Sequence, residues 1–303
     1  MKKCRIPGTD LEVSKICLGT MTFGTPVAEQ DAVKLVHHAL DRGINFIDTA
    51  NMYEGYARVP GSSGGVAEEI MGKALRGRRN EAVIATKVGM KVGTAPEDEY
   101  TSPAAIKKQL ERSLKKLDTD VIDIYYVHRH DPVTPPEEIV YALDKAKREG
   151  KIRYYAVSNY SAQQLGNLIK AAAAAGLPKP VICQPPLSIL KQDSLDDMIP
   201  LCDREGIAVV PYQIFQGGLL TGKYKRGAPV PEGSRKAEKP DWVWNFDDEL
   251  YAKLESIEKD AQKENLTMTQ YAIRWTLRQP AVVSAIVGVK KTEQIDDAAA
   301  AVE

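Results

Sequence analysis

Four side chains able to handle protons follow apolar runs in the first half of the chain: Asp48, Tyr53, Lys87 and His128. A tyrosine near its free pKa of about 10 is a poor acid at neutral pH, so a nearby cation such as Lys87 is needed to lower that pKa. A buried lysine tends to lose its proton, and a neighbouring carboxylate such as Asp48 keeps it charged. With His128 donating a hydrogen bond to a carbonyl oxygen, the set suits proton transfer to that oxygen.

Each of the four residues also has an ordinary structural role open to it. Asp48 can cap a turn, because Asp is favoured in turns, and Tyr53 can be an aromatic residue at the rim. Lys87 and Asp48 can form a structural ion pair, and His128 can be an interior histidine with satisfied hydrogen bonds. The coincidence of all four at strand ends favours one shared site.

The apolar runs are the elements that must position these groups. Residues 45–47 end at Asp48, residues 82–86 end at Lys87 and residues 121–127 end at His128. Their length and apolar character are typical of strands buried on both faces. Side chains at the ends of three strands meet only if the strands lie side by side, as the C-terminal ends do in a barrel of parallel strands.

Four short motifs resemble those of the aldo-keto reductases. They are residues 47–50 with Tyr53, residues 85–87, residues 126–128 and, near the start, residues 18–21. The resemblance covers nearly the whole chain, and four motifs in the family's order are far more specific than any one. It implies a (β/α)8 TIM barrel that transfers hydride between NADP(H) and an aldehyde, ketone or sugar-like carbonyl, without a covalent intermediate. Tyr53 would then be the general acid.

The rest of the chain fits a barrel formed as a single domain, residues 1–303. Two extended pieces on either side of a turn at residues 7–10 predict an N-terminal hairpin that caps one end. Eight strands are expected from Ile16 onward, alternating with helices, which favours a closed barrel over an open sheet. No G-x-G-x-x-G turn follows the first strand, as an open dinucleotide fold would require. The glycines and prolines of residues 221–248 predict a long loop over the mouth after strand seven.

The expected cofactor contacts are strand ends and two loops. By resemblance, Ser158, Asn159 and Gln184 hold the nicotinamide carboxamide. Phosphates in such barrels commonly lie at the loops after strands seven and eight, where residues 216–223 and 288–294 resemble the family's pyrophosphate and adenosine phosphate sites. The full set comprises Gly19, Thr20, Met21, Asp48, Ser158, Asn159, Gln184, Tyr212, Gln213, Ile214, Gln216, Gly218, Leu220, Lys223, Gly288, Lys290, Gln294 and Asp297.

Some positions leave open readings or depart from the family pattern. Lys290 and Lys291 can be solvated charges, although a place before the last helix favours a phosphate role. Leu187 stands where the family often stacks an aromatic ring on the nicotinamide, which predicts looser stacking. Residues 56–65 form a longer segment than usual, rich in glycine and serine, and we expect a mobile flap over the substrate.

Composition limits the partners. The chain has 41 basic and 41 acidic residues, so nothing indicates nucleic acid or an anionic membrane surface as a partner. Cys4, Cys17, Cys183 and Cys202 are scattered, which indicates structural thiols in a reducing compartment and no metal site. No apolar run is long enough to span a bilayer and no secretory signal is present, so a cytosolic location is expected. The sequence does not indicate an oligomeric state.

Two other functions remain open from the sequence. Some proteins with this barrel act chiefly as cofactor-sensing subunits of channels, and a fold alone does not settle function. A barrel hydrolase or aldolase that uses Lys87 to form a Schiff base is the other alternative.

Overall fold

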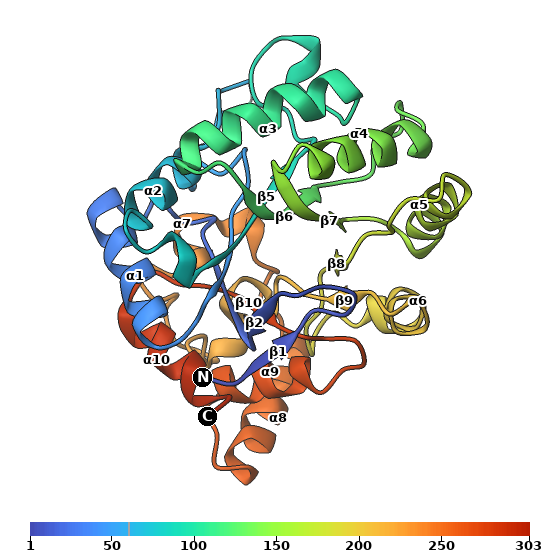
Figure 1. Cartoon of the computed structure of the whole chain (residues 1–303). Coiled ribbons are helices and arrows are strands. Elements are labelled where there is room, and N and C mark those ends of the chain that lie inside the picture. Colours follow the sequence, from blue (N-terminus) through green and yellow to red (C-terminus); the bar gives the residue numbers. More distant parts are fainter. Residues whose placement is uncertain (60) are drawn as a thin grey trace.

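The computed structural model describes residues 1–59 and 61–303, and its centre is a sheet of eight parallel strands (Figure 1). The strands are β3 (Ile16–Gly19), β4 (Phe46–Asp48), β5 (Val83–Val88), β6 (Ile122–Val127), β7 (Ile152–Ser158), β8 (Ile182–Gln184), β9 (Ala208–Val209) and β10 (Ala285–Gly288). They are ordered β10-β3-β4-β5-β6-β7-β8-β9. Backbone contacts join the outer two strands: Val209 bridges to Val282, and the N–H of Ile286 donates to the carbonyl of Pro211 at 3.0 Å. The predicted (β/α)8 barrel is therefore confirmed.

Side chains alternate between the inside and the outside of this barrel, because successive residues of a strand point to opposite faces. Phe46, Ala85, Ile124 and Ala156 belong to an interior cluster with the predicted N-terminal hairpin, β1 (Lys3–Arg5) and β2 (Glu12–Ser14). The hairpin contributes Ile6, Leu11 and Val13, all buried, to that cluster. It therefore plugs one end of the barrel with apolar side chains, as predicted.

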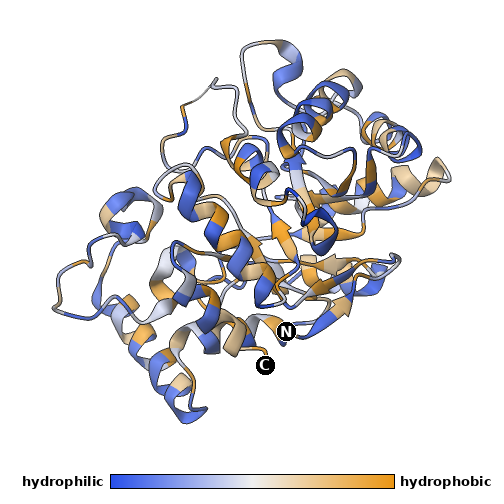
Figure 2. Ribbon diagram, turned by 60° about the vertical axis from the view of Figure 1, so that its left-hand side comes forward, coloured by the Kyte–Doolittle hydropathy of each residue, from blue (hydrophilic) through white to orange (hydrophobic). Residues whose placement is uncertain are grey.

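Helices cover the outside of the barrel (Figure 1). They are α1 (Glu29–Asp41), α2 (Val66–Ala74), α3 (Pro103–Leu117), α4 (Pro136–Arg148), α5 (Ala162–Ala174), α6 (Met198–Glu205), α8 (Asp248–Lys263), α9 (Met268–Leu277) and α10 (Thr292–Ala300). The short helix α7 (Arg235–Glu238) lies in the loop after β9. Figure 2 shows hydrophobic residues concentrated on the central strands and blue, hydrophilic stretches on the outer helices. A capping box forms at the start of α5, where Ser161 accepts from the N–H of Gln164 at 3.2 Å.

The structure differs from the sequence expectations mainly after β9. Residues 221–248, expected as a long loop, contain the short helix α7 and the 3-10 turn η5 (Pro240–Trp242). The segment just before them forms another 3-10 turn, η4 (Gln216–Thr221). Two helices that we did not assign, α8 and α9, separate this loop from β10. Below, residues 210–247 are called the β9–α8 loop.

In the described part of the chain, no helix combines the length and apolar character that a bilayer span requires. The two chain ends lie close together at α1 (Figure 1), where Arg42 pairs with Glu303 at 2.9 Å.

Substitution of two helical glycines by alanine should change the unfolding free energy in opposite directions. A Cβ on Gly72 of α2 would lie 2.5 Å from the carbonyl oxygen of Lys116, so Gly72→Ala should push α2 away from α3 and cost about 1–3 kcal/mol of unfolding free energy. Gly166 of α5 has no atom within 4 Å of such a Cβ, so Gly166→Ala should add about 0.5–1 kcal/mol. Urea denaturation of both variants measures the two changes, and equal effects would contradict this packing.

Candidate active site

The predicted proton-handling residues lie just beyond the apolar interior of the barrel, at the C-terminal ends of the strands. Asp48 follows Phe46 by two residues, and Lys87 follows Ala85 by two, so each continues an inward-facing row. On β7, Ser158 likewise follows the inward-facing Ala156 by two residues. The C-terminal ends of the strands, here called the mouth, therefore carry a polar layer on an apolar barrel.

Lys87 is the centre of this polar layer. Its side chain is 0% exposed, and its ammonium contacts the Asp48 carboxylate at 2.5 Å. It also donates to the carbonyl of Thr49 at 2.8 Å and to the Tyr53 hydroxyl at 3.3 Å. Gln184 donates to the second carboxylate oxygen of Asp48 at 2.8 Å, so both oxygens are occupied.

His128 lies beside Tyr53. The two rings meet edge to face with centroids 5.9 Å apart and an interplanar angle of 80°. The N–H of His128 donates to the carbonyl of Val88 at 2.8 Å, and its own carbonyl accepts from the Asn159 amide at 2.8 Å. Its Nδ1 is buried and has no hydrogen-bond partner among the described residues. The structure thus brings together all four residues that the sequence singled out.

Burial is the largest influence on the pKa values of Tyr53, Lys87 and His128. It raises the pKa of Tyr53 above its usual value, and the Lys87 ammonium offsets that rise only in part. Burial alone would lower the pKa of Lys87, but the charge of Asp48 and the contact with Tyr53 raise it above its usual value. Burial, followed by the charge of Lys87, holds the pKa of His128 well below its usual range. At neutral pH the site therefore holds an ammonium, a neutral tyrosine and a neutral imidazole. Lys87 acts on the pKa of Tyr53 in the predicted, lowering direction, but burial outweighs that effect.

A hydrogen-bonded chain lines the next part of the mouth. Ser158 donates to the carbonyl of Gln184 at 2.9 Å and accepts from Asn159 at 3.1 Å. The hydroxyl of Tyr212 donates to the Asn159 side-chain oxygen at 2.7 Å. Asn159 takes a positive φ of 55°, a conformation that asparagine tolerates better than most residues. These four predicted cofactor contacts form one network next to Asp48.

Leu187 does not face this network. Its side chain is 0% exposed and packs in the cluster between the barrel and its helices. Tyr212, which is bonded to Leu187 through the backbone at 3.1 Å, is the aromatic residue at the mouth. Burial raises the pKa of Tyr212, and the nearby Lys87 ammonium acts in the opposite direction. Leu187 therefore does not lie at the mouth, where it was expected to give looser stacking on the nicotinamide. Tyr212 supplies the ring that is available there.

The remaining predicted contacts near β3 and β9 differ in burial and in hydrogen bonding. Thr20 bonds the Asp48 carbonyl through its N–H at 3.0 Å and its hydroxyl at 3.1 Å. Gln216 is buried and its Oε1 lacks a partner among the described residues. Gly19 ends β3, Met21 is half-buried, Gln213 is exposed, Ile214 and Leu220 are buried, and Gly218 has a φ of 96°.

The loop after β10 joins the β9–α8 loop. Lys290 pairs with Glu238 of α7 and donates to the carbonyl of Gly233 at 2.9 Å. The side chain of Gln294 accepts from the N–H groups of Lys290 and Lys291 at 2.7 and 3.2 Å, at the start of α10. Gly288 ends β10 and is exposed.

Asp297 lies one turn beyond Gln294 on α10. It accepts from Gln270 of α9 at 2.8 Å and contacts Thr267 at 3.2 Å. Its carboxylate is thus engaged with the start of α9. A part for it in cofactor binding stays a prediction.

Segment 56–65 is attached at both ends. Tyr56 is 9% exposed, and its N–H donates to the carbonyl of Thr25 at 2.7 Å. At the other end Lys116 donates to the carbonyl of Gly64. The segment is therefore held at both ends, and Pro60 lies outside the described residues. Its role as a mobile flap over the substrate stays a prediction.

Sequence reasoning missed the partners of Tyr56. Its ring packs edge to face on Trp242 with centroids 5.4 Å apart, and it has the Arg235 guanidinium 5.4 Å and the Lys290 ammonium 5.3 Å away. Trp242 and Trp244 of the β9–α8 loop are the only signal in the sequence, because aromatic loop residues are candidate pocket walls, but they do not reveal their partner. Three loops therefore meet over one side of the mouth.

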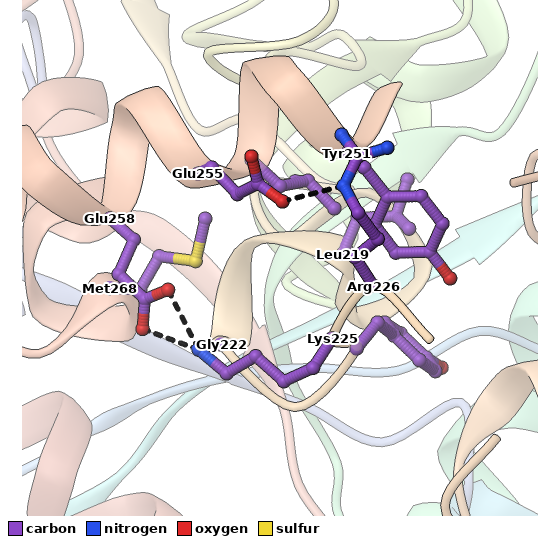
Figure 3. A pocket seen from close by; sticks show the side chains of 10 residues that line it. Leu219, Gly222, Lys225, Arg226, Tyr251, Glu255, Glu258 and Met268 are labelled. Atoms are coloured by element: carbon purple, nitrogen blue, oxygen red, sulfur yellow. Dashed lines mark hydrogen bonds and ion pairs between the residues drawn. The ribbon is translucent and has the colours of Figure 1, made fainter. Parts of the chain in front are cut away.

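A separate hollow of about 40 Å³ lies between the β9–α8 loop and α8 (Figure 3). Arg226 pairs with Glu255 at 2.9 Å and Lys225 with Glu258 at 2.5 Å across it. Its charges are already paired and none of the four proton-handling residues lines it, so it is not the reaction site. In the described residues no group of three or more His, Cys, Asp or Glu side chains could hold a metal ion, and the cysteines are free.

Comparisons with known proteins agree on one family. The sequence profile of the Aldo/keto reductase family matches residues 15–303. The aldo-keto reductase YhdN from Bacillus subtilis is 31% identical, over 98% of this chain and 87% of the relative. A probable voltage-gated potassium channel subunit beta from Arabidopsis thaliana is 33% identical, over 97% and 88%. The structure of the glycerol dehydrogenase AKR11B4 from Gluconobacter oxydans matches with a TM-score of 0.83 at 31% identity, over 99% of this chain and 90% of that one.

The buried ion pair predicts a large change in stability. Lys87→Met leaves the Asp48 carboxylate buried without its cation and should cost about 3–5 kcal/mol of unfolding free energy. Asp48→Asn should also destabilise, and the double variant should lose clearly less than the two single losses together. The matched control is Lys73→Met, whose partner Glu29 is half-exposed, and it should change stability little. Urea denaturation that gives Lys87→Met no larger effect than this control would contradict the assignment.

Proposed function

Because the chain belongs to the aldo/keto reductase family, we propose that it is an NADP(H)-dependent reductase of aldehydes, ketones or sugar-like carbonyls. The observation that carries the proposal is the contact of Lys87 with both Asp48 and Tyr53, with the ring of His128 edge to face on Tyr53. The family and the dehydrogenase neighbour support an oxidoreductase that uses a nicotinamide cofactor. The phosphorylated form and the carbonyl class are our inference.

The residues present fit that cofactor. Ser158, Asn159 and Gln184 offer amide and hydroxyl groups beside Asp48, and Tyr212 offers a ring. Farther out, Lys223 and Lys290 supply positive charge near the glycine-containing turn η4 and the start of α10. When bound, the nicotinamide supplies or accepts the hydride.

The proton chemistry then falls to this chain. His128, neutral at working pH, donates a hydrogen bond to the substrate oxygen and orients it. Tyr53 gives its hydroxyl proton to that oxygen as the carbonyl carbon receives the hydride, so the carbonyl becomes an alcohol. Lys87 lies 3.3 Å from the Tyr53 oxygen and stabilises the phenolate that remains. Asp48 keeps Lys87 charged throughout.

The channel-associated alternative has support of its own, since one relative is named as a probable potassium channel subunit beta. A cofactor-sensing subunit would bind NADPH and turn over carbonyls weakly or not at all. Mixing the protein with NADPH and a panel of carbonyls, while following absorbance of the reduced nicotinamide, separates the two functions.

A Schiff-base enzyme is disfavoured by the state of Lys87. A nucleophilic lysine must be neutral, and the pKa of Lys87 is raised, with its ammonium enclosed by Asp48, Thr49 and Tyr53. Borohydride should therefore trap no adduct with substrate. We further propose that residues 1–303 act as one barrel unit in the cytosol; oligomeric state stays open.

Tyr53→Phe removes the proposed proton donor and should lower kcat for carbonyl reduction at least about a hundredfold. NADPH binding, measured by fluorescence titration, should stay nearly unchanged. Since burial raises the pKa of Tyr53, the acid stays protonated and wild-type reduction should hold its rate from neutral pH to about pH 10. Near-normal turnover by the variant would refute the assignment.

Lys290→Ala should weaken NADPH binding about ten- to a hundredfold, because a charge-assisted contact to the extra phosphate is lost. NADH carries no such phosphate, so its affinity should change little. Lys170→Ala is the matched control, since that lysine is exposed on the outer helix α5 and belongs to neither phosphate loop. A wild type that binds both cofactors equally would show the phosphate preference to be wrong.

A further inference from the structure

The ammonium of Lys290 is already paired within the protein. It contacts the Glu238 carboxylate of α7 and the carbonyl of Gly233, both in the β9–α8 loop. The two charged side chains are only 25% and 28% exposed, so the pair is mostly shielded from water. An ammonium has three donors, and this loop already uses two of them.

Glu238 stands among several cations. Burial lowers the pKa of Lys223, and the charges of Lys290 and Arg235 lower it further, while Glu238 acts in the opposite direction. Lys239 and Arg235 both lie over the ring of Tyr56, as Lys290 does. The carboxylate of Glu238 thus neutralises part of a cationic group that would otherwise suit an anionic ligand.

We propose that Glu238 is a specificity-determining residue: its carboxylate occupies the phosphate position on Lys290 and competes with the adenosine phosphate of NADPH. This inference rests on the proposed function, in which Lys290 meets that phosphate. A carboxylate and a phosphate dianion repel each other at one ammonium, so Glu238 must leave Lys290 before the phosphate binds. NADH brings no phosphate to this position and need not displace Glu238. Glu238 therefore narrows the preference for NADPH over NADH.

The moving partner in this exchange is α7. Lys290 follows β10 directly, and its ammonium lies 5.3 Å from the ring of Tyr56, which is fixed to Thr25 through its backbone. Glu238 ends a helix of only four residues inside the β9–α8 loop. The Tyr56 hydroxyl is buried without a partner among the described residues, so it is a further polar group left for a ligand. Displacing α7 therefore disturbs less of the barrel than displacing Lys290.

The test is Glu238→Gln, which keeps the size of the side chain and removes its charge. Fluorescence titration without carbonyl substrate should show NADPH binding about two- to fivefold more tightly, the range for releasing a partly exposed ion pair. NADH affinity should change less than twofold. The control is Glu232→Gln, an exposed acid of the same loop, which should leave both affinities unchanged. Thermal melting checks that each variant is folded.

Combining Glu238→Gln with Lys290→Ala separates this inference from the proposed function. In the Lys290→Ala background the gain from Glu238→Gln should largely vanish, because the competition acts through that ammonium. Unchanged or weaker NADPH binding by the Glu238→Gln single variant would overturn the inference, as would equal tightening of NADPH and NADH. If Lys290→Ala alone leaves NADPH affinity intact, the phosphate role of Lys290 has failed first.

Discussion

The structure depends on one buried ion pair, Lys87 with Asp48, placed where the apolar interior of the barrel ends. Removing two charges from water costs several kcal/mol per ion, and their attraction offsets this only when the remaining hydrogen-bonding positions are filled. The carbonyl of Thr49 and the amide of Gln184 fill them. These groups come from the ends of separate strands, so the barrel must close correctly before the pair is stable. In return the pair fixes the charge beside Tyr53.

Strand register decides whether this pair exists. Asp48 lies opposite Gly19 on one side and Ala85 on the other, while Lys87 lies opposite Tyr126. A slip of one residue would turn Asp48 or Lys87 out toward the helices, because side chains alternate across a strand. The apolar rows beneath, closed by the N-terminal hairpin, oppose such a slip. The same packing that stabilises the barrel therefore also orients its polar layer.

The sequence predicted the barrel well, and also that Asp48, Tyr53, Lys87 and His128 lie together, because both follow from local features: apolar runs, their length and the residue at which each ends. It predicted the β9–α8 loop poorly. Turn residues marked where that loop begins, but the pairing of Glu238 with Lys290 joins residues 52 apart. Leu187 was misplaced for a similar reason, since position along the chain does not reveal which side chain the next strand brings to the mouth. Contacts between loops are set by tertiary packing, which no single sequence window contains.

Because the pKa of Tyr53 is raised, the role of Lys87 is not to ionise Tyr53 in the resting site. A cation beside a tyrosine suggests a tyrosine already inclined to ionise, but burial outweighs the cation in the resting site. Tyr53 therefore keeps its proton, as a donor to a carbonyl oxygen must. In the proposed reaction the phenolate appears only after that proton has left, and then the ammonium 3.3 Å away acts at full strength in a water-poor site. Lys87 thus stabilises the phenolate formed during proton transfer more than it stabilises the neutral tyrosine. An interaction accelerates a step only when it is stronger in the transition state than in the ground state.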